Sequence, residues 1–161
     1  MVKLKISNII NLKSFIHEKL LPDKKIKLAL ISNFPNADDI EWSFKNNTYE
    51  AAFTQEGVFK IASFDDNGEL KEERTTIFEK QLPDNIKELL NIDYNMNLLV
   101  SATEITKIQN KILEIVLDSY DKSRYLLQFN DKGQLLKEQL LFAIKKDLFS
   151  SSKNQSSDKS E

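Results

Sequence analysis

The chain carries few side chains that could act as a nucleophile, a base or a metal ligand. It has no cysteine and a single histidine, His17, so disulfides, thiolate catalysis and cysteine-ligated metals are excluded. A serine nucleophile needs a histidine that takes its proton. Because His17 precedes Glu18 and Lys19 in a helical pattern, we interpret it as a solvated surface residue. We therefore predict no catalytic residue, and any metal site would have to be built almost wholly from carboxylates.

The acidic stretch "SFDDNGELKEER", residues 63–74, has the outline of a calcium-binding loop. An EF-hand loop places Asp at its first position and a bidentate Glu at its twelfth. Ser63 and Arg74 occupy those two positions, so the motif does not fit. We interpret Asp65 and Asp66 as residues of a hairpin turn.

Two other kinds of site fail on spacing. Glu72 and Glu73 are adjacent in a predicted strand, so they point to opposite faces of a sheet and cannot work as an acid and base pair. The three glycines, Gly57, Gly68 and Gly133, form neither of the common phosphate-binding loops. No metal and no cofactor are predicted.

The composition indicates a soluble globular protein. The 161 residues are 40% hydrophobic and 30% charged, and no apolar run approaches the roughly 20 residues that cross a bilayer. With 23 basic and 25 acidic side chains the net charge is −2, so no basic excess is available for a phosphate backbone. We predict no nucleic-acid partner and no transmembrane segment.

Two helices are predicted before the first strand. Residues 1–20 form an amphipathic helix, in which we expect the apolar side chains to dock on the protein's own core. A second helix has Pro22 at its first position and ends at Pro35. The apolar positions of the first helix, at spacings of three and four, are Ile9, Leu12, Phe15, Ile16 and Leu20.

Alternating apolar and polar residues then predict four strands joined by turns. Their sequences are "DDIEWSF", "TYEAAF", "VFKIASF" and "ELKEERTTIF", with turn residues such as Gly68 between them. Trp42 shares a face with Ile40 and Phe44, so we expect it to pack in the core beneath a helix.

The second half of the chain echoes the first. "LPDNIKELL" at 82–90 resembles "LPDKKIKLAL" at 21–30, and "FNDKGQLLKEQ" at 129–139 resembles "FDDNGELKEER" at 64–74. Strands follow in the same order, which indicates an internal duplication of about 60 residues that shares one core.

The predicted fold class is α+β. We expect two tandem repeats of a helix plus a four-stranded antiparallel meander, at 21–78 and 82–142, within a domain 21–149. The helices would pack on one face of the sheet, with 1–20 as an extra N-terminal helix. Residues 150–161 are rich in serine and lack apolar side chains, so we predict a disordered tail.

These segments together resemble the PepSY-like, beta-lactamase-inhibitor-like family of bacterial proteins. The resemblance covers about residues 21–142 and rests on "LP" opening a helix, "FPNA" at 34–37, Ile40 with Trp42, and "FDDNG" at 64–68. It implies a helix-plus-sheet fold like that of small beta-lactamase inhibitors and a periplasmic or secreted location. It does not imply inhibition of a beta-lactamase. The chain shows no secretion signal at its start, so the compartment stays open.

The function predicted is that of a non-catalytic module that binds a protein or peptide through the open face of the sheet and can act as an inhibitor. Two alternatives are a hydrolase that uses carboxylates alone and a structural protein that forms homodimers; we expect a monomer or a weak homodimer. The candidate binding residues on the open face are Glu41, Ser43, Glu50, Lys60 and Arg74.

Overall fold

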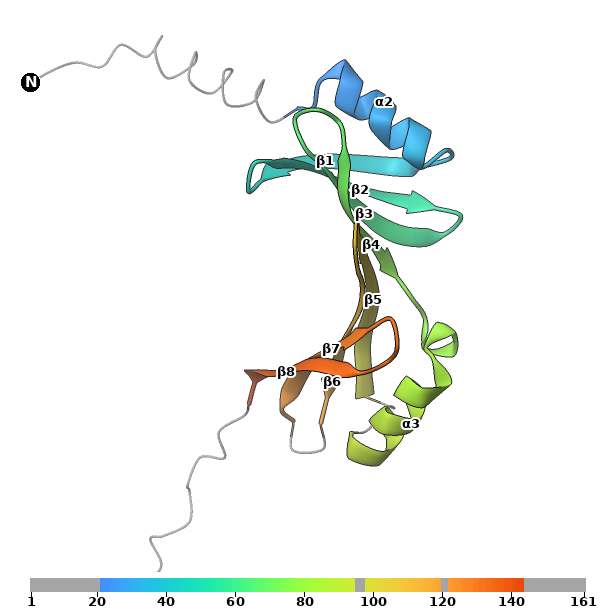
Figure 1. Ribbon diagram of the computed structural model, residues 1–161, viewed down its shortest axis with the longest axis vertical. Coiled ribbons are helices and arrows are strands. Elements are labelled where there is room, and N and C mark those ends of the chain that lie inside the picture. Colours follow the sequence, from blue (N-terminus) through green and yellow to red (C-terminus); the bar gives the residue numbers. More distant parts are fainter. Residues whose placement is uncertain (1–20, 95–97, 120–121, 144–161) are drawn as a thin grey trace, which may run out of the picture.

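The protein is an α+β structure dominated by one antiparallel sheet (Figure 1). The computed structural model describes residues 21–94, 98–119 and 122–143. The predicted N-terminal helix with His17, and the predicted tail, lie outside these residues. All eight strands expected from the alternation are present. Their bounds are β1 Asp38–Lys45, β2 Thr48–Gln55, β3 Val58–Phe64, β4 Leu70–Thr76, β5 Leu99–Lys107, β6 Lys111–Asp118, β7 Arg124–Asn130 and β8 Leu135–Phe142.

The strands form a single eight-stranded sheet in the order β1 to β8. The prediction of two tandem helix-plus-meander repeats is wrong, because β4 pairs directly with β5 over 72–76 and 103–107. Two separate meanders would each leave a further strand edge with unpaired backbone groups, and joining β4 to β5 removes both edges. Within the described residues only two α-helices, α2 Lys24–Asn33 and α3 Asp84–Asp93, accompany the sheet, with one 3₁₀ turn at Glu79–Gln81.

Both helices lie on the outer side of the curved sheet, and the other face lies on the inside of the curve (Figure 1). Each helix covers a separate core cluster. The first cluster contains Ile26, Leu30, Phe34, Ala51, Phe53, Ala62 and Phe64, with Trp42 packed against it as predicted. The second cluster contains Leu82, Ile86, Leu90, Ala102, Leu113, Ile115, Leu117, Leu127 and Phe129. The sheet is therefore continuous, whereas its hydrophobic core is divided in two.

The two helices begin differently. The side chain of Asp23 accepts a hydrogen bond of 3.0 Å from the Ile26 amide and caps α2, so Pro22 precedes the cap instead of taking the predicted first helical position. The residue before α3 is Pro83, which offers no side-chain cap. In the described part of the chain, neither helix is long and apolar enough to span a membrane.

The turns β3–β4 and β7–β8 have the same hydrogen bonds. The Oδ1 atom of Asp65 accepts from the amides of residues 67 and 69, and the Oδ1 atom of Asn130 accepts from those of residues 132 and 134. Gly68 and Gly133 have φ of 78° and 75°, which L-residues with a Cβ atom adopt at a cost. A Cβ atom on Gly68 would lie 3.4 Å from Ala29 of α2, and one on Gly133 would meet the Asn85 amide of α3. Each turn thus abuts its helix.

Candidate binding face of the sheet

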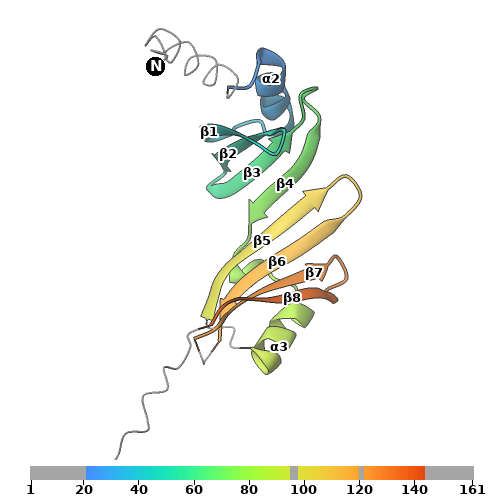
Figure 2. The same cartoon turned by 90° about the vertical axis from the view of Figure 1, so that its left-hand side faces the viewer.

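The face without helices is turned toward the viewer in Figure 2. The strand register places two rows of side chains across it. The strand register aligns the first of them, which we call the polar row, from β1 to β5. Its members are Ser43, Glu50, Ser63, Glu72 and Lys107. All five side chains are polar, and only Ser63 among them is buried, so this row can offer hydrogen bonds and charges to a partner.

The second row, which we call the apolar row, brings one arginine between aliphatic side chains. Arg74 on β4 lies opposite Ile61 on β3 and Ile105 on β5, and Ile105 lies opposite Ile112 on β6. The Arg74 side chain is 45% exposed. An exposed guanidinium flanked by aliphatic groups combines the two features that are common in the centres of protein interfaces.

One carboxylate links the two rows. Glu72 accepts from Arg74 Nε at 2.6 Å and forms an ion pair of 3.0 Å with Lys107 Nζ. Burial opposes the ionisation of Glu72, but the hydrogen bonds from Lys107 and Arg74 outweigh it and lower the pKa of this carboxyl. Glu72 is therefore charged at neutral pH and holds Arg74 and Lys107 in place.

Four of the five predicted binding residues lie on this face. Glu41 lies opposite Ala52, Ser43 opposite Glu50, and Arg74 in the apolar row. Glu41 and Ser43 are exposed and Glu50 is half-buried. The structure places Arg74 at the middle of the sheet and the other three on the edge pair β1–β2, so they form the polar margin of the face, with Arg74 nearer its centre.

Lys60, the fifth predicted residue, lies on the opposite face. It pairs with Phe53 and Thr75 in the register, its Nζ atom lies 2.8 Å from Glu73, and it is 5.5 Å from the centre of the Phe34 ring. The strand "VFKIASF" has apolar residues on both faces, so its lysine did not mark the solvent side. Because Phe64 is fully buried, Lys60, an even number of residues away, must share the helix-covered face.

Sequence reasoning missed most of the centre of the face. Ile61, Ile105 and Ile112 were read only as strand residues, and Glu72 only as a failed catalytic partner. The signal that could have found them is the pairing of β4 with β5, because it brings Arg74 and Ile105 together across 31 residues of sequence. That pairing cannot be read from local alternation.

Glu72 and Glu73 do not form an acid and base pair. Glu72 and Glu73 do point to opposite faces, since Glu72 lies opposite Ser63 and Glu73 opposite the buried Ala62. Within the described ranges there is no group of three or more His, Asp or Glu side chains that could hold a metal ion.

Comparisons with known proteins identify the fold. No protein-family model matches this chain, and no curated protein matches it by sequence. Solved structures do match. A candidate periplasmic protein from Bacteroides eggerthii has a TM-score of 0.69 at 19% identity, covering 74% of this chain and 89% of that one. A DUF2874 family protein from Bacteroides uniformis has a TM-score of 0.69 at 17% identity, covering 74% and 90%.

A third similar structure is a BLIP-like protein from Bacteroides fragilis. Its TM-score is 0.66 at 23% identity, and the match covers 76% of this chain and 88% of that one. Identity at this level relates the folds of the proteins and does not relate their activities. The chain described here has a BLIP-like fold.

Proposed function

We propose that this protein is a non-catalytic module that binds a protein or peptide through the uncovered face of its sheet. The observation that carries the proposal is the apolar row, in which Arg74 stands between Ile61 and Ile105. A partner that covers this row would bury the remaining surface of the half-buried Ile61 and Ile112 and desolvate a guanidinium already held by Glu72. Arginine in such a setting is a frequent source of binding energy.

Charged side chains in the polar row and beside it give the proposed face its specificity. Glu41 and Glu50 add negative charge toward β1, whereas Arg74 and Lys107 place positive charge near the centre. A partner with the complementary pattern would be favoured over others, because unmatched charges across an interface cost binding energy.

Two more specific forms of the proposal are that the protein inhibits an enzyme and that it acts outside the cytoplasm. The BLIP-like neighbour and the candidate periplasmic neighbour support them as analogies of fold. The PepSY-like part of the sequence resemblance, and the domain bounds 21–149, stay predictions.

The test uses the full chain and a charge reversal at the centre of the face. Arg74→Glu removes the guanidinium and places a carboxylate beside Glu72, so we expect a partner captured from the native lysate to be lost. Lys27→Glu on α2 makes the same change of charge on an exposed residue of the helix side and serves as the matched control. The partner is then purified and its Kd measured by calorimetry.

We expect Arg74→Glu to weaken binding at least about thirtyfold, or roughly 2 kcal/mol, as at an interface hot spot. Lys27→Glu should leave the Kd unchanged within about twofold. Equal binding by both variants, with folding unchanged by circular dichroism, would remove the uncovered face from the proposal.

A specific observation favours one alternative, a protein that forms homodimers. The edge strand β8 is exposed along its whole length, and five of its side chains are large and apolar. They are Leu135, Leu136, Leu140, Leu141 and Phe142. The other edge, β1, carries Asp38, Asp39 and a register shift, which are features that prevent edge pairing. Pairing of the β8 strands of two copies would therefore use up both apolar edges and give a closed dimer. Pairing of β8 with β1 of another copy would not form.

Sedimentation of the full chain at increasing concentration tests this alternative. Leu136→Lys with Leu140→Lys should abolish any concentration-dependent dimer, and Ile40→Lys on β1 should not. A dimer that survives the β8 changes would exclude the edge contact.

A further inference from the structure

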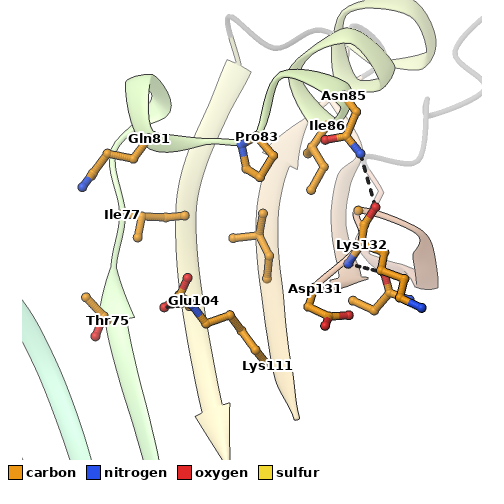
Figure 3. Close-up of a pocket in the computed structure, with 13 residues that line it drawn as sticks. Thr75, Ile77, Gln81, Pro83, Asn85, Ile86, Glu104, Lys111, Asp131 and Lys132 are labelled. Atoms are coloured by element: carbon orange, nitrogen blue, oxygen red, sulfur yellow. Dashed lines mark hydrogen bonds and ion pairs between the residues drawn. The ribbon is translucent and has the colours of Figure 1, made fainter.

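A cavity of about 460 Å³ lies on the helix-covered side, between the N-terminus of α3 and the middle strands (Figure 3). Its apolar floor consists of Ile77, Pro83, Ile86 and Leu113, and polar side chains surround it. Ligand sites in proteins have volumes of roughly 300–1,000 Å³ and join an apolar lining to a few polar groups. The size and lining of this cavity are therefore those of a small-molecule site, and it lies on the face opposite the apolar row.

The reason for the cavity emerges from the corresponding place under α2. In the first half, Phe64, which ends β3, lies opposite Tyr49, and Tyr49 lies opposite Phe44. The ring centroids of Phe44 and Tyr49 are 4.8 Å apart. Aromatic side chains fill that space.

The second half has smaller or charged side chains at the same register positions. Phe129 lies opposite Leu113, and Leu113 lies opposite Glu104. One strand position further along, Ala102 stands where the first half has Trp42, since these residues pair with Ile115 and Ala51 respectively. Leu113 and Glu104 line the cavity at the register positions where the first half has the rings of Tyr49 and Phe44.

Four charged side chains line the cavity, and they divide into two kinds. Glu104 and Lys111 neutralise each other in an ion pair of 2.8 Å. Asp131 and Lys132, neighbours in the β7–β8 turn, also line it, and the described residues give neither of these two side chains an ion-pair partner. Two consecutive exposed residues of one turn, a carboxylate and an ammonium with no ion pair to the described residues, thus line a cavity that has an apolar floor.

We propose that this cavity binds a free α-amino acid with an apolar side chain. The ammonium and carboxylate groups of such a molecule are adjacent, as are Asp131 and Lys132, which match them with opposite charges. Its apolar side chain would cover Ile77, Ile86 and Leu113 and bury surface that is now open to water. Neither a simple amine nor a simple acid would use both free charges.

The test is a titration of the full chain, labelled at its isoleucine and leucine methyl groups, with L-leucine followed by NMR. We expect saturable shifts of the Ile77, Ile86 and Leu113 methyl signals with a Kd on the order of millimolar, as for a ligand of this size. N-acetyl-L-leucine lacks the ammonium and L-leucinamide lacks the carboxylate. Each should bind about two- to fivefold more weakly, the worth of one exposed charge pair.

Variants locate the binding to this cavity. Asp131→Asn should weaken L-leucine binding by the same factor as removal of the ligand's ammonium group. Lys132→Gln should weaken it by the same factor as removal of the ligand's carboxylate. Asp66→Asn, at the matching position of the β3–β4 turn, is the control and should change nothing. Leu113→Tyr introduces the residue type that fills the first half, and it should abolish binding while the thermal unfolding midpoint shows that the chain still folds.

Two results would overturn the proposal. One is the absence of saturable shifts at the three methyl groups of the wild-type chain. The other is equal binding of L-leucine and L-leucinamide, which would mean that the cavity does not recognise the zwitterion. Because Asp131→Asn and Lys132→Gln change only exposed turn residues, both readouts remain available if Leu113→Tyr fails to fold.

Discussion

The two ends of the sheet keep the same frame and fill it with different side chains. In both, a turn with a side-chain oxygen at its start abuts a helix, and two apolar helix residues four positions apart are buried, Ile26 and Leu30 in α2 and Ile86 and Leu90 in α3. Beneath α2 the facing strand residues are the small pair Ala51 and Ala62. Beneath α3 they are Ile115 and Leu127.

The two ends distribute side-chain volume differently between the strand positions beneath the helix and the positions around them. The first end combines small alanines beneath its helix with aromatic rings around them. Among these, the ring centroids of Phe34 and Phe53 are 5.0 Å apart. The second end places its bulk directly beneath α3 and leaves the rim open. A core tolerates such exchanges as long as the total packing holds, so one frame can yield a closed end and an end with a cavity.

The largest expected effect comes from emptying either core. Phe64 and Phe129 are both fully buried, so Phe64→Ala and Phe129→Ala should each lower the free energy of unfolding by about 3–5 kcal/mol. Because β4 pairs with β5, we expect either change to destabilise both clusters together. Methyl NMR signals of the two clusters, followed through urea unfolding, measure this.

If the two ends unfold independently, the continuous sheet does not couple the two core clusters. In that case Phe64→Ala would shift the midpoint of Ile26 and Leu30 and leave that of Ile86 and Leu90 unchanged. Ile92→Ala, at an α3 residue that is 74% exposed, controls for mutation at a surface position and should shift neither midpoint.

The next effect concerns the turn glycines. Gly68→Ala and Gly133→Ala should each cost about 1–2 kcal/mol, because both backbones have positive φ and a Cβ atom is strained there. A Cβ atom at Gly133 would also clash with the amide of Asn85, an exposed side chain that can move aside, so Gly133→Ala should cost slightly more. Chemical unfolding measures both values.

A second change makes the glycine test specific. Adding Asn85→Ala to Gly133→Ala should remove the extra cost. The loss in free energy of unfolding caused by Gly133→Ala should then equal that caused by Gly68→Ala. If Gly133→Ala stays more destabilising in the double variant, contact with α3 is not the cause. Gly57→Ala gives the baseline, because its φ is 77° and no atom lies within 4 Å of the added Cβ.

The helix starts should differ by a smaller amount. Asp23→Ala removes the cap of α2 and should cost about 1 kcal/mol. Asp84→Ala should cost at most a few tenths of a kcal/mol, because this fully exposed carboxylate only pairs with Lys87 at 3.1 Å and surface pairs contribute little. Equal losses in chemical unfolding would show that Asp84 caps α3 in solution.

Local pattern was sufficient to predict every strand, because alternation reports which face of a strand is buried. It could not predict that β4 joins β5, since pairing between distant strands depends on backbone edges that no local residue marks. Hence the two-repeat description was wrong, and most of the centre of the uncovered face, apart from Arg74, was missed.

The same limit applies to single residues. Glu41 and Ser43 alternate with apolar residues of β1, and Trp42 between them packs against the first cluster, so their face followed from parity, whereas Lys60 was assigned by its polarity and lies with the core. The cavity could not be predicted either. It depends on Leu113 and Glu104 meeting across two strands next to α3, and only the register brings them there.

The smallest expected effect separates the two turns by pH. Lys71 bonds to Asp65 at 2.9 Å, and this bond, with the amide of Glu69, lowers the pKa of Asp65 below its ordinary value of 3.8. A carboxyl with a lowered folded pKa adds stability above its unfolded pKa and loses it as the pH falls through the folded pKa. Asn130, in the same position of the other turn, carries no charge.

Asp65→Asn should therefore lower the thermal midpoint modestly at neutral pH and have almost no effect once the pH is well below 3.8. Asn130→Ala, which removes the uncharged acceptor of the other turn, should lower the midpoint by the same amount at both pH values. Because Asn130 already shows that an amide oxygen accepts both turn amides, a loss from Asp65→Asn that persists in acid would mean that turn geometry, and not the Lys71 pair, distinguishes the two ends.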